Sequence, residues 1–262
     1  NKKTSYIFIM PKKKLLIFII TYKASYRLNE VIKKISFKNL SSYNTSILIS
    51  DDASGDDTIK YAKSIKSKMK KNIFVNINKK NLGYGGNIKK CLNFSIKKKF
   101  DYSVMIHGDG QYDPKYIPHL LNWFLKNDKI SAITGSRLLM GSHKAKKGNM
   151  PFYKLIGNIT LTKIFNFLLN TNFTDAHTGL WAYNLTHLRK MNFRLLTDGY
   201  NFDNEFRFLN ILNNKIIKEI SIQAKYGDEK SQLHIKYAIR FFLNTLLFFL
   251  AKKKLFHLNR FK

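Results

Sequence analysis

Residues 14–50 read KLLIFIITYKASYRLNEVIKKISFKNLSSYNTSILIS, and this stretch decides the fold class. Two isoleucine-rich apolar runs, Lys14–Thr21 and Thr45–Ser50, flank a segment with helical spacing of Leu28, Val31, Ile32 and Ile35. A continuous apolar run predicts a strand buried on both faces, whereas the helical spacing predicts an amphipathic helix. Strand, helix and strand in this order predict a right-handed βαβ unit in a parallel sheet.

The same alternation continues along the chain. NIFVNIN predicts a third, shorter strand and DYSVMIH a fourth, each followed by a helical pattern. The second half predicts a strand and then a loop in Ser131–Gly141, a long apolar helix at Tyr153–Leu169, and a turn and strand in Thr174–Asn184. A helix in GYNFDNEFRFLNIL, a strand in KEISIQAKYG and a last helix at Tyr237–Ala251 follow. We therefore expect an α/β fold with a mostly parallel sheet flanked by helices.

The composition limits the classes of protein to which the chain can belong. With 47 Lys and Arg against 16 Asp and Glu, the formal net charge of the chain is +31. The 44% of apolar residues exclude a disordered polycation, and the single Cys91 excludes a disulfide framework or a cysteine-rich metal site. The charge fits nucleic acid, anionic lipid headgroups or phosphorylated substrates, and a compositional bias of the genome is an equal alternative. Because the lysines are spread along the whole chain, we do not expect a nucleic-acid partner.

Polar clusters follow three of the predicted strands. They are Asp51–Asp52, Asn81–Asn87 and Asp109–Gln111. Ligands of open α/β sheets bind outside the carboxyl ends of the strands, so these clusters predict one crevice. The loop after the first strand, TYKASYRLNE, contains no glycine, which argues against a dinucleotide bound in the G-x-G-x-x-G manner.

Each cluster suggests a chemistry and has a simpler alternative. Asp51 and Asp52 could hold a ribose diol, or they could belong to a turn before a helix cap. Asp109 and Gln111 would point the same way in an extended segment and suit Mg²⁺ or Mn²⁺ already held by a diphosphate. The alternative is a turn that closes the strand. His107 could add a third ligand, most plausibly to Mn²⁺, or be an ordinary hydrogen-bonded histidine.

Five motifs in order, ISDDASGDDT, NLGYGGN, GDGQYDP, GSR and DAHTGLWAY, resemble the family-2 glycosyltransferases of GT-A fold, a Rossmann-like architecture. Within that family the chain is most similar to the dolichyl-phosphate mannosyltransferase and bacterial polyprenyl-phosphate glycosyltransferase branch. The resemblance extends from about Leu15 to Ser231.

The resemblance implies the donor site. Its nucleotide-sugar-binding positions are Thr21, Tyr22, Asp51, Asp52, Asn81, Gly83, Gly86, Asn87, Gly108 and Asp109. The metal positions are Asp109, Gln111 and His107, and His107 replaces the first aspartate of the family's D-x-D motif. The first loop also departs from the family, since it keeps Tyr22 but lacks the usual acidic residue.

The resemblance also implies the acceptor side. Arg137 of GSR corresponds to a residue that engages phosphate, and a guanidinium fork suits that task. Thr178, Gly179 and Lys225 complete the phosphate-binding set, and the catalytic set is Asp109, Arg137, Asp175 and Glu205. A polyprenyl phosphate is already ionised and needs no strong base, whereas a saccharide hydroxyl would need one, for which Asp175 or Glu205 are the candidates.

We therefore expect a metal-dependent, inverting glycosyltransferase that moves a sugar from a UDP- or GDP-sugar to a polyprenyl phosphate. The alternatives are transfer to a saccharide hydroxyl in surface-polysaccharide synthesis and, more distantly, a nucleic-acid-binding protein or an inactive glycan or lipid binder. We divide residues 12–232 into a nucleotide-sugar half, about 12–140, and an acceptor half, about 141–232.

The two late apolar helices, flanked by lysines, predict attachment to an anionic membrane surface. Residues 233–262 would form a basic amphipathic anchor. With no secretory signal and no segment long enough to span, we expect a peripheral or monotopic enzyme on the cytoplasmic face. The alternative for these helices is ordinary packing or the interface of a homo-oligomer.

Overall fold

A computed structural model describes residues 11–69, 72–142, 148–223, 225–226, 235–255 and 261. Within these residues, seven strands form one sheet in the order β3-β2-β1-β4-β6-β5-β7. The strands are β1 (Lys13–Thr21), β2 (Tyr43–Asp51), β3 (Ile73–Ile77), β4 (Tyr102–His107), β5 (Ile130–Ser136), β6 (Trp181–Asn184) and β7 (Ile216–Ser221). Neighbouring strands run parallel except where β6 pairs with β4 and β5. The predicted α/β fold with a mostly parallel sheet is confirmed.

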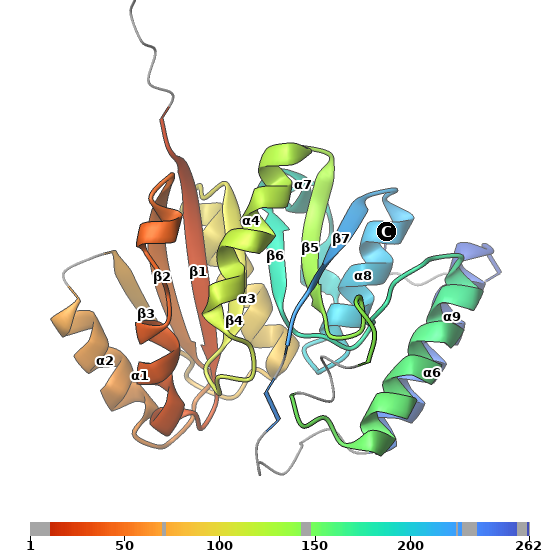
Figure 1. Cartoon of the computed structure of the whole chain (residues 1–262), viewed down its shortest axis with the longest axis horizontal. Helices are drawn as coiled ribbons and strands as arrows, with labels where there is room; N and C mark the ends of the chain where they lie inside the picture. Colours follow the sequence, from red (N-terminus) through yellow and green to blue (C-terminus); the bar gives the residue numbers. More distant parts are fainter. Residues whose placement is uncertain are drawn as a thin grey trace, which may run out of the picture.

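Helices cover both faces of the sheet (Figure 1). One face carries α1 (Ser25–Lys33), α2 (Thr58–Lys68) and α4 (Ile117–Lys126), and the other carries α3 (Tyr84–Lys97) and α8 (Phe202–Leu212). The short elements are η1 (Lys38–Leu40), η2 (Pro114–Tyr116), α7 (Leu185–Leu188) and η3 (Phe193–Leu195).

The central strand β1 explains why the sheet is buried on both sides. Its odd positions from Leu15 to Ile19 pack on the side of α1, α2 and α4. Its even positions from Leu16 to Ile20 pack on the side of α3 and α8. Each such side chain contributes about 1.5–3 kcal/mol when it leaves water. The continuous apolar run of β1 is thus the sequence of a strand between two helical layers.

The strand order also locates a crevice. The chain moves outward from β1 to β3 and then crosses back to β4, so the topological switch point lies between β1 and β4. The segment after β4 lies against the end of β1, because Gly108 N donates to Ile20 O (2.9 Å). A Cβ at Gly108 would lie 2.6 Å from Thr21 Cγ2, so this approach requires glycine.

Two long helices, α6 (Phe152–Leu169) and α9 (Ile235–Lys252), lie side by side beyond α8 (Figure 1). They pack on α8 through aromatic contacts, among them Phe208 stacked on Phe248 with ring centroids 4.2 Å apart. Their outer sides expose large apolar residues: Phe152, Tyr153, Ile156, Phe167, Ile239, Phe242 and Leu243. In the described part of the chain, no helix combines the length and apolarity that a membrane crossing requires.

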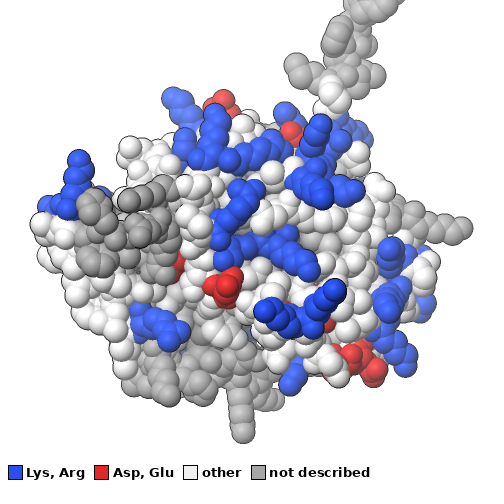
Figure 2. Space-filling model, turned by 180° about the vertical axis from the view of Figure 1, so that it is seen from behind, with Lys and Arg blue, Asp and Glu red and all other residues white. Residues whose placement is uncertain are grey.

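The helix predicted in residues 233–262 is α9, while residues 227–234, 256–260 and 262 lie outside the described residues. Lysine and arginine are spread over the face seen from behind, with few acidic residues among them (Figure 2).

Candidate functional site

The segment after β4 is a turn, so our expectation of an extended segment was wrong. Gly110 adopts a left-handed conformation with φ of 76°, and Gln111 N donates to Asp109 Oδ1 (2.9 Å). Asp109 and Gln111 are therefore not aligned by strand alternation. The turn presents the partly exposed carboxylate of Asp109 at the switch point between β1 and β4.

This carboxylate fits a divalent cation bound largely through substrate. In the described residues, no group of three or more His, Cys, Asp or Glu side chains could hold a metal by itself. Mg²⁺ and Mn²⁺ are commonly held by one or two carboxylates together with phosphate oxygens and water. Asp109 would hold such an ion, and Gln111 lies in the same turn, so a cation here would depend on a bound diphosphate.

His107, on the inner side of this turn, contacts two tyrosines. Its Nε2 lies 3.3 Å from the Tyr84 hydroxyl, and its ring meets those of Tyr84 and Tyr112 edge-on. Burial lowers the pKa of His107 although the charge of Asp109 opposes this, so the ring is neutral near pH 7. His107 thus has a hydrogen-bond partner in Tyr84, and its role as a metal ligand stays a prediction.

The Tyr84 hydroxyl also reaches Asp203, a residue that the sequence analysis missed. Tyr84 donates to Asp203 Oδ2 (2.7 Å), and Asp203 is partly exposed at the start of α8. Burial raises the pKa of Asp203 to about 7, against the hydrogen bond from Tyr84 and the charge of Arg207. Such a carboxyl group is suited to proton transfer near neutral pH.

Glu205, the candidate base named from the sequence, is placed differently. It is 1% exposed, and its Oε2 accepts the N–H of Thr197 (2.8 Å), so it fixes the loop before α8. Of the two residues Asp203 is the partly exposed one, although its Oδ1 is buried without a hydrogen-bond partner. The sequence did offer this second carboxylate, because Asp203 precedes Glu205 by two positions in the FDNEF motif.

The predicted nucleoside contacts Asp51 and Asp52 are largely occupied by the protein. Asp51 is fully buried and accepts hydrogen bonds from Ser54 N (3.0 Å) and Thr21 Oγ1 (3.2 Å). Asp52 Oδ1 accepts the N–H of Leu82 (2.8 Å). Both carboxylates therefore fix the loops around the crevice, and their contact with a nucleoside stays a prediction.

The glycines of NLGYGGN make room for another loop. The N–H groups of Gly85 and Gly86 donate to the carbonyl oxygen of Asp198 (2.7 and 3.1 Å). A Cβ at Gly83 would lie 2.6 Å from that same oxygen, and one at Gly85 would lie 2.3 Å from Thr197 O. The amino end of α3 is thus capped by the 197–199 loop, which leaves these N–H groups unavailable to a diphosphate in this conformation.

The remaining donor-side residues lie in two environments. Asn87 is buried and bonds through its amide to Ser50 O (3.1 Å), whereas Asn81 and Tyr22 are exposed at the rim. Across the crevice, Tyr200 is exposed and stacks on Tyr84 with ring centroids 5.6 Å apart. Exposed tyrosines from both halves of the chain therefore border the crevice.

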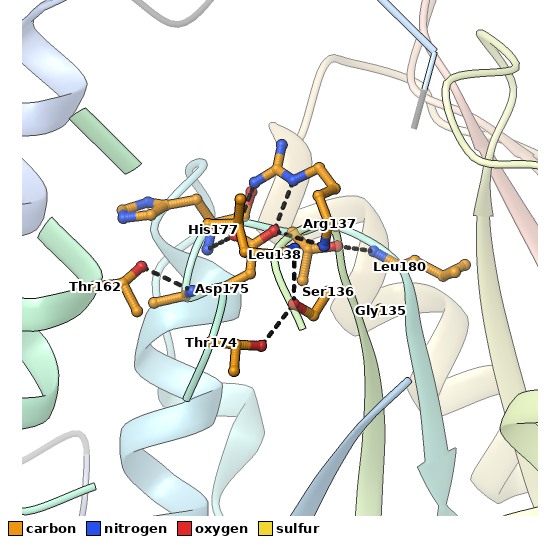
Figure 3. Close-up of polar contacts among 12 residues, drawn as sticks. Gly135, Ser136, Arg137, Leu138, Thr162, Thr174, Asp175, His177 and Leu180 are labelled. Carbon is orange, nitrogen blue, oxygen red and sulfur yellow. Dashed lines mark hydrogen bonds and ion pairs between the residues drawn. The ribbon is translucent and has the colours of Figure 1, made fainter. Parts of the chain in front are cut away.

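Arg137 and Asp175 form a buried ion pair at the end of β5 (Figure 3). Arg137 Nε donates to Asp175 Oδ2 (2.6 Å), and its Nη2 donates to Asp175 Oδ1 (2.8 Å) and to His177 O (3.0 Å). Burial would raise the pKa of Asp175, but the charge and hydrogen bonds of Arg137 hold it well below its usual range. A carboxylate this acidic is a poor general base, so that suggested role of Asp175 is not supported.

Thr178 and Gly179 are buried behind the turn of residues 108–111, which carries the proposed metal ligands Asp109 and Gln111 and is called the metal turn below. Gly179 N donates to the Tyr112 hydroxyl (2.9 Å), and Thr178 is 1% exposed, so neither is open to a ligand in this conformation. Lys225 is exposed, and its backbone N–H donates to Gln111 O (2.9 Å). This bond ties the segment that follows β7, called the last loop below, to the metal turn.

The sequence and fold have known relatives. Residues 16–191 match the model of the family described as "Glycosyl transferase family 2". A dolichyl-phosphate N-acetylglucosaminyltransferase of Methanococcus voltae that is named for UDP-N-acetylglucosamine is 28% identical over 225 residues, which are 81% of this chain and 87% of that protein. The undecaprenyl-phosphate mannosyltransferase of Micrococcus luteus is 24% identical over 193 residues, 71% of this chain and 75% of that protein.

Solved structures show the same fold. Glucosyl-3-phosphoglycerate synthase from Mycobacterium tuberculosis bound to phosphoglyceric acid is 13% identical with a TM-score of 0.67, covering 91% of this chain and 80% of that chain. The same enzyme in complex with Mn²⁺, UDP and glucosyl-3-phosphoglycerate is 13% identical with a TM-score of 0.62, over 91% and 80% of the two chains. The chain belongs to glycosyltransferase family 2 and has the GT-A fold.

Proposed function

We propose that this enzyme transfers a sugar from a nucleotide-sugar donor, a UDP- or GDP-sugar, to a polyprenyl phosphate at a membrane surface. One observation carries the proposal: exposed apolar residues adjoin a lysine at the start of α6, near the carboxyl end of β5. Phe152 and Tyr153 at the start of α6 are 72% and 71% exposed, and Lys154 follows directly. Leu139 and Met140 of the preceding loop are exposed as well.

The charges at this place suit a phosphate monoester. Burial and the charge of Arg137 lower the pKa of Lys154, which indicates a second cation close to the Arg137–Asp175 pair. Asp175 offsets the charge of Arg137, so Lys154 is left to neutralise an incoming anion. In an amphiphile with a long apolar chain and a phosphate head, the phosphate could pair with Lys154 and the chain could pack on the exposed apolar residues nearby.

In this proposal α6 and α9 rest on the cytoplasmic surface of the membrane, and the enzyme is peripheral or monotopic. Mg²⁺ or Mn²⁺ at Asp109 would neutralise the departing nucleoside diphosphate. The acceptor phosphate is already ionised and attacks the anomeric carbon from the opposite side, with inversion. Residues of the 12–140 half would bind the donor, and those of the 141–232 half the acceptor.

A second candidate, transfer to a saccharide hydroxyl, is favoured by one observation. Asp203 at the start of α8 is held by Tyr84, burial raises its pKa to about 7, and a hydroxyl acceptor would need such a base. Transfer to a phosphate would not need it. The effect of Asp203→Asn therefore separates the two candidates.

The test is to incubate the purified protein with Mn²⁺ or Mg²⁺, a panel of nucleotide sugars and undecaprenyl phosphate in detergent, and to measure nucleotide release. We expect release with one donor that requires the lipid, is lost in Asp109→Asn and is retained in Asp203→Asn. Asp113→Asn is the matched control, because it changes a carboxylate of the same loop that caps η2.

A product that is extracted into chloroform and labile to mild acid would identify the sugar phosphate. Folded protein that releases no nucleotide with any donor, in the presence of the lipid, would contradict the proposal. Release that depends on a saccharide acceptor and is abolished by Asp203→Asn would establish the second candidate instead.

A further inference from the structure

Tyr226 lies where the metal turn, the Arg137–Asp175 pair and the start of α6 meet. Its hydroxyl accepts a hydrogen bond from Arg137 Nη1, and its backbone N–H donates to Gly148 O (2.8 Å). Its ring packs with the apolar cluster that includes Met150. The ammonium of Lys154 lies 5.8 Å from the ring centroid.

The guanidinium of Arg137 has little capacity left for a ligand. Of its five N–H groups, Nε and both on Nη2 are taken by Asp175 and by the carbonyl of His177, and one on Nη1 is taken by Tyr226. The side chain is almost fully buried, so its fork faces Asp175 rather than solvent. A phosphate could be reached by one N–H of Arg137 at most, without breaking the ion pair.

The hydroxyl of Tyr226 is in the opposite situation. It uses a lone pair to accept from Arg137, and its own hydrogen has no acceptor among the residues that the structure describes. A hydroxyl that accepts from a cation becomes a stronger donor, because hydrogen bonds in a chain polarise one another. Lys154 supplies a positive charge on the same side.

We infer that Tyr226 is an acceptor-binding residue whose hydroxyl donates a hydrogen bond to the phosphate of the acceptor, with Arg137 behind it and Lys154 beside it. The inference rests on the proposed phosphate acceptor and deepens it. Arg137 then acts as a positioning residue that orients and polarises the tyrosine. The acceptor phosphate is bound by a phenol and a lysine rather than by the guanidinium fork.

The chain offers a matched control for this role. A second tyrosine hydroxyl contacts the chain shortly before Tyr226, because the hydroxyl of Tyr116 accepts the N–H of Gln223 (2.9 Å). Tyr226→Phe and Tyr116→Phe each remove one hydroxyl that contacts this loop or its ligands, and each keeps the ring. A purely structural effect of loosening the loop would appear in both variants, whereas a direct contact with phosphate would appear only in Tyr226→Phe.

The test is equilibrium binding of farnesyl phosphate to the full-length protein by calorimetry, without donor, with farnesol as the ligand that lacks the phosphate. We expect Tyr226→Phe to weaken binding of farnesyl phosphate about tenfold or more, the loss typical of one hydrogen bond to a charged group. Binding of farnesol should not change, and Tyr116→Phe should bind both ligands as the wild type does. In turnover with undecaprenyl phosphate, Tyr226→Phe should raise the KM for the lipid with little change in kcat.

Equal affinities of the wild type and Tyr226→Phe for farnesyl phosphate would overturn the inference. An equal loss in Tyr116→Phe would overturn it too, because the loop and not the hydroxyl would then be responsible. If the wild type itself prefers farnesyl phosphate no more than farnesol, the proposed phosphate acceptor fails and the inference falls with it. That outcome is read from the wild type alone, so the two failures are distinguishable.

Discussion

Replacing Asp175 by asparagine tests the assignment of this carboxylate to a structural ion pair. The two ion-pair contacts are 2.6 and 2.8 Å long, and the N–H groups of Arg137 and His177 add two hydrogen bonds of 3.1 Å each. Arg137 and Asp175 are 4% and 0% exposed. Removing one partner of a buried pair leaves the other charge uncompensated, at a cost of about 3–5 kcal/mol. We expect about 3 kcal/mol for Asp175→Asn, because the amide oxygen can still accept from Arg137.

Urea unfolding at pH 7 measures this cost, and a double-mutant cycle isolates the pair. The variants are Asp175→Asn, Arg137→Met and both together. Because the double variant leaves neither member of this pair as an unpaired buried charge, we expect it to be at least about 2 kcal/mol more stable than the sum of the two single losses predicts.

The pH dependence has a defined sign. The pKa of Asp175 is lowered in the folded protein, so its contribution is present above the unfolded value of about 3.9 and is lost as the pH falls further. The stability difference between the wild type and Asp175→Asn should therefore be constant from pH 7 to about pH 5 and shrink below about pH 4.

Two results would refute the reasoning. A loss of less than about 1 kcal/mol, with additive single variants, would mean that the pair is not closed in solution. A stable Asp175→Asn protein that loses kcat but keeps its KM for the acceptor would mean that Asp175 acts in the chemistry.

Three further predictions concern packing and protonation. In Gly179→Ala the new Cβ would lie 2.8 Å from His107 Cε1, so we expect a loss of about 1–3 kcal/mol in urea unfolding together with reduced nucleotide release; unchanged values would show that the ring can move. Burial lowers the pKa of His177 to about 3, so the unfolded chain binds a proton between about pH 6.5 and 3 that the native state does not. The stability of the wild type relative to His177→Gln should thus fall by about 1.4 kcal/mol per pH unit on acidification, and a gap independent of pH in unfolding titrations would contradict this burial. Lys89 Nζ bonds to two carbonyl oxygens and a carboxylate of the 194–198 loop, so Lys89→Met should cost about 1.5–3 kcal/mol and accelerate amide exchange in that loop; unaltered exchange would show that the lysine is not what holds it.

The sequence predicted the layers because they depend on local periodicity. Residues Leu15–Ile20 are apolar at consecutive positions, which is typical of a strand between two helical layers, and the structure confirms it. The position of Asp109 was also predictable, since the carboxyl ends of parallel strands share one edge. Neither inference required a contact between distant side chains.

The surroundings of the predicted site residues, in contrast, depend on such contacts. Arg137 and Asp175 are 38 positions apart, and a charged residue in a motif suggests a ligand contact unless its partner is known. Gly83 and Gly86 were expected to bind the nucleotide sugar, and the structure shows that Asp198 lies against both: a Cβ at Gly83 would be 2.6 Å from its carbonyl oxygen, which also accepts the N–H of Gly86. In both cases the sequence correctly marked a constrained position, and only the tertiary structure shows which group constrains it.

The acceptor question reduces to two carboxylates with opposite environments. Asp175 is paired with a guanidinium and remains ionised, whereas Asp203 is held by a phenol, and burial raises its pKa to about 7. Only the second can exchange a proton near neutral pH, and only a hydroxyl acceptor would use that exchange. On the other side, Lys154 and the exposed residues at the start of α6 favour an apolar molecule with an anionic head. Transfer to a hydroxyl would need Asp203 as a base, and transfer to a phosphate would not. The activity of Asp203→Asn with a lipid phosphate therefore decides between the two acceptors.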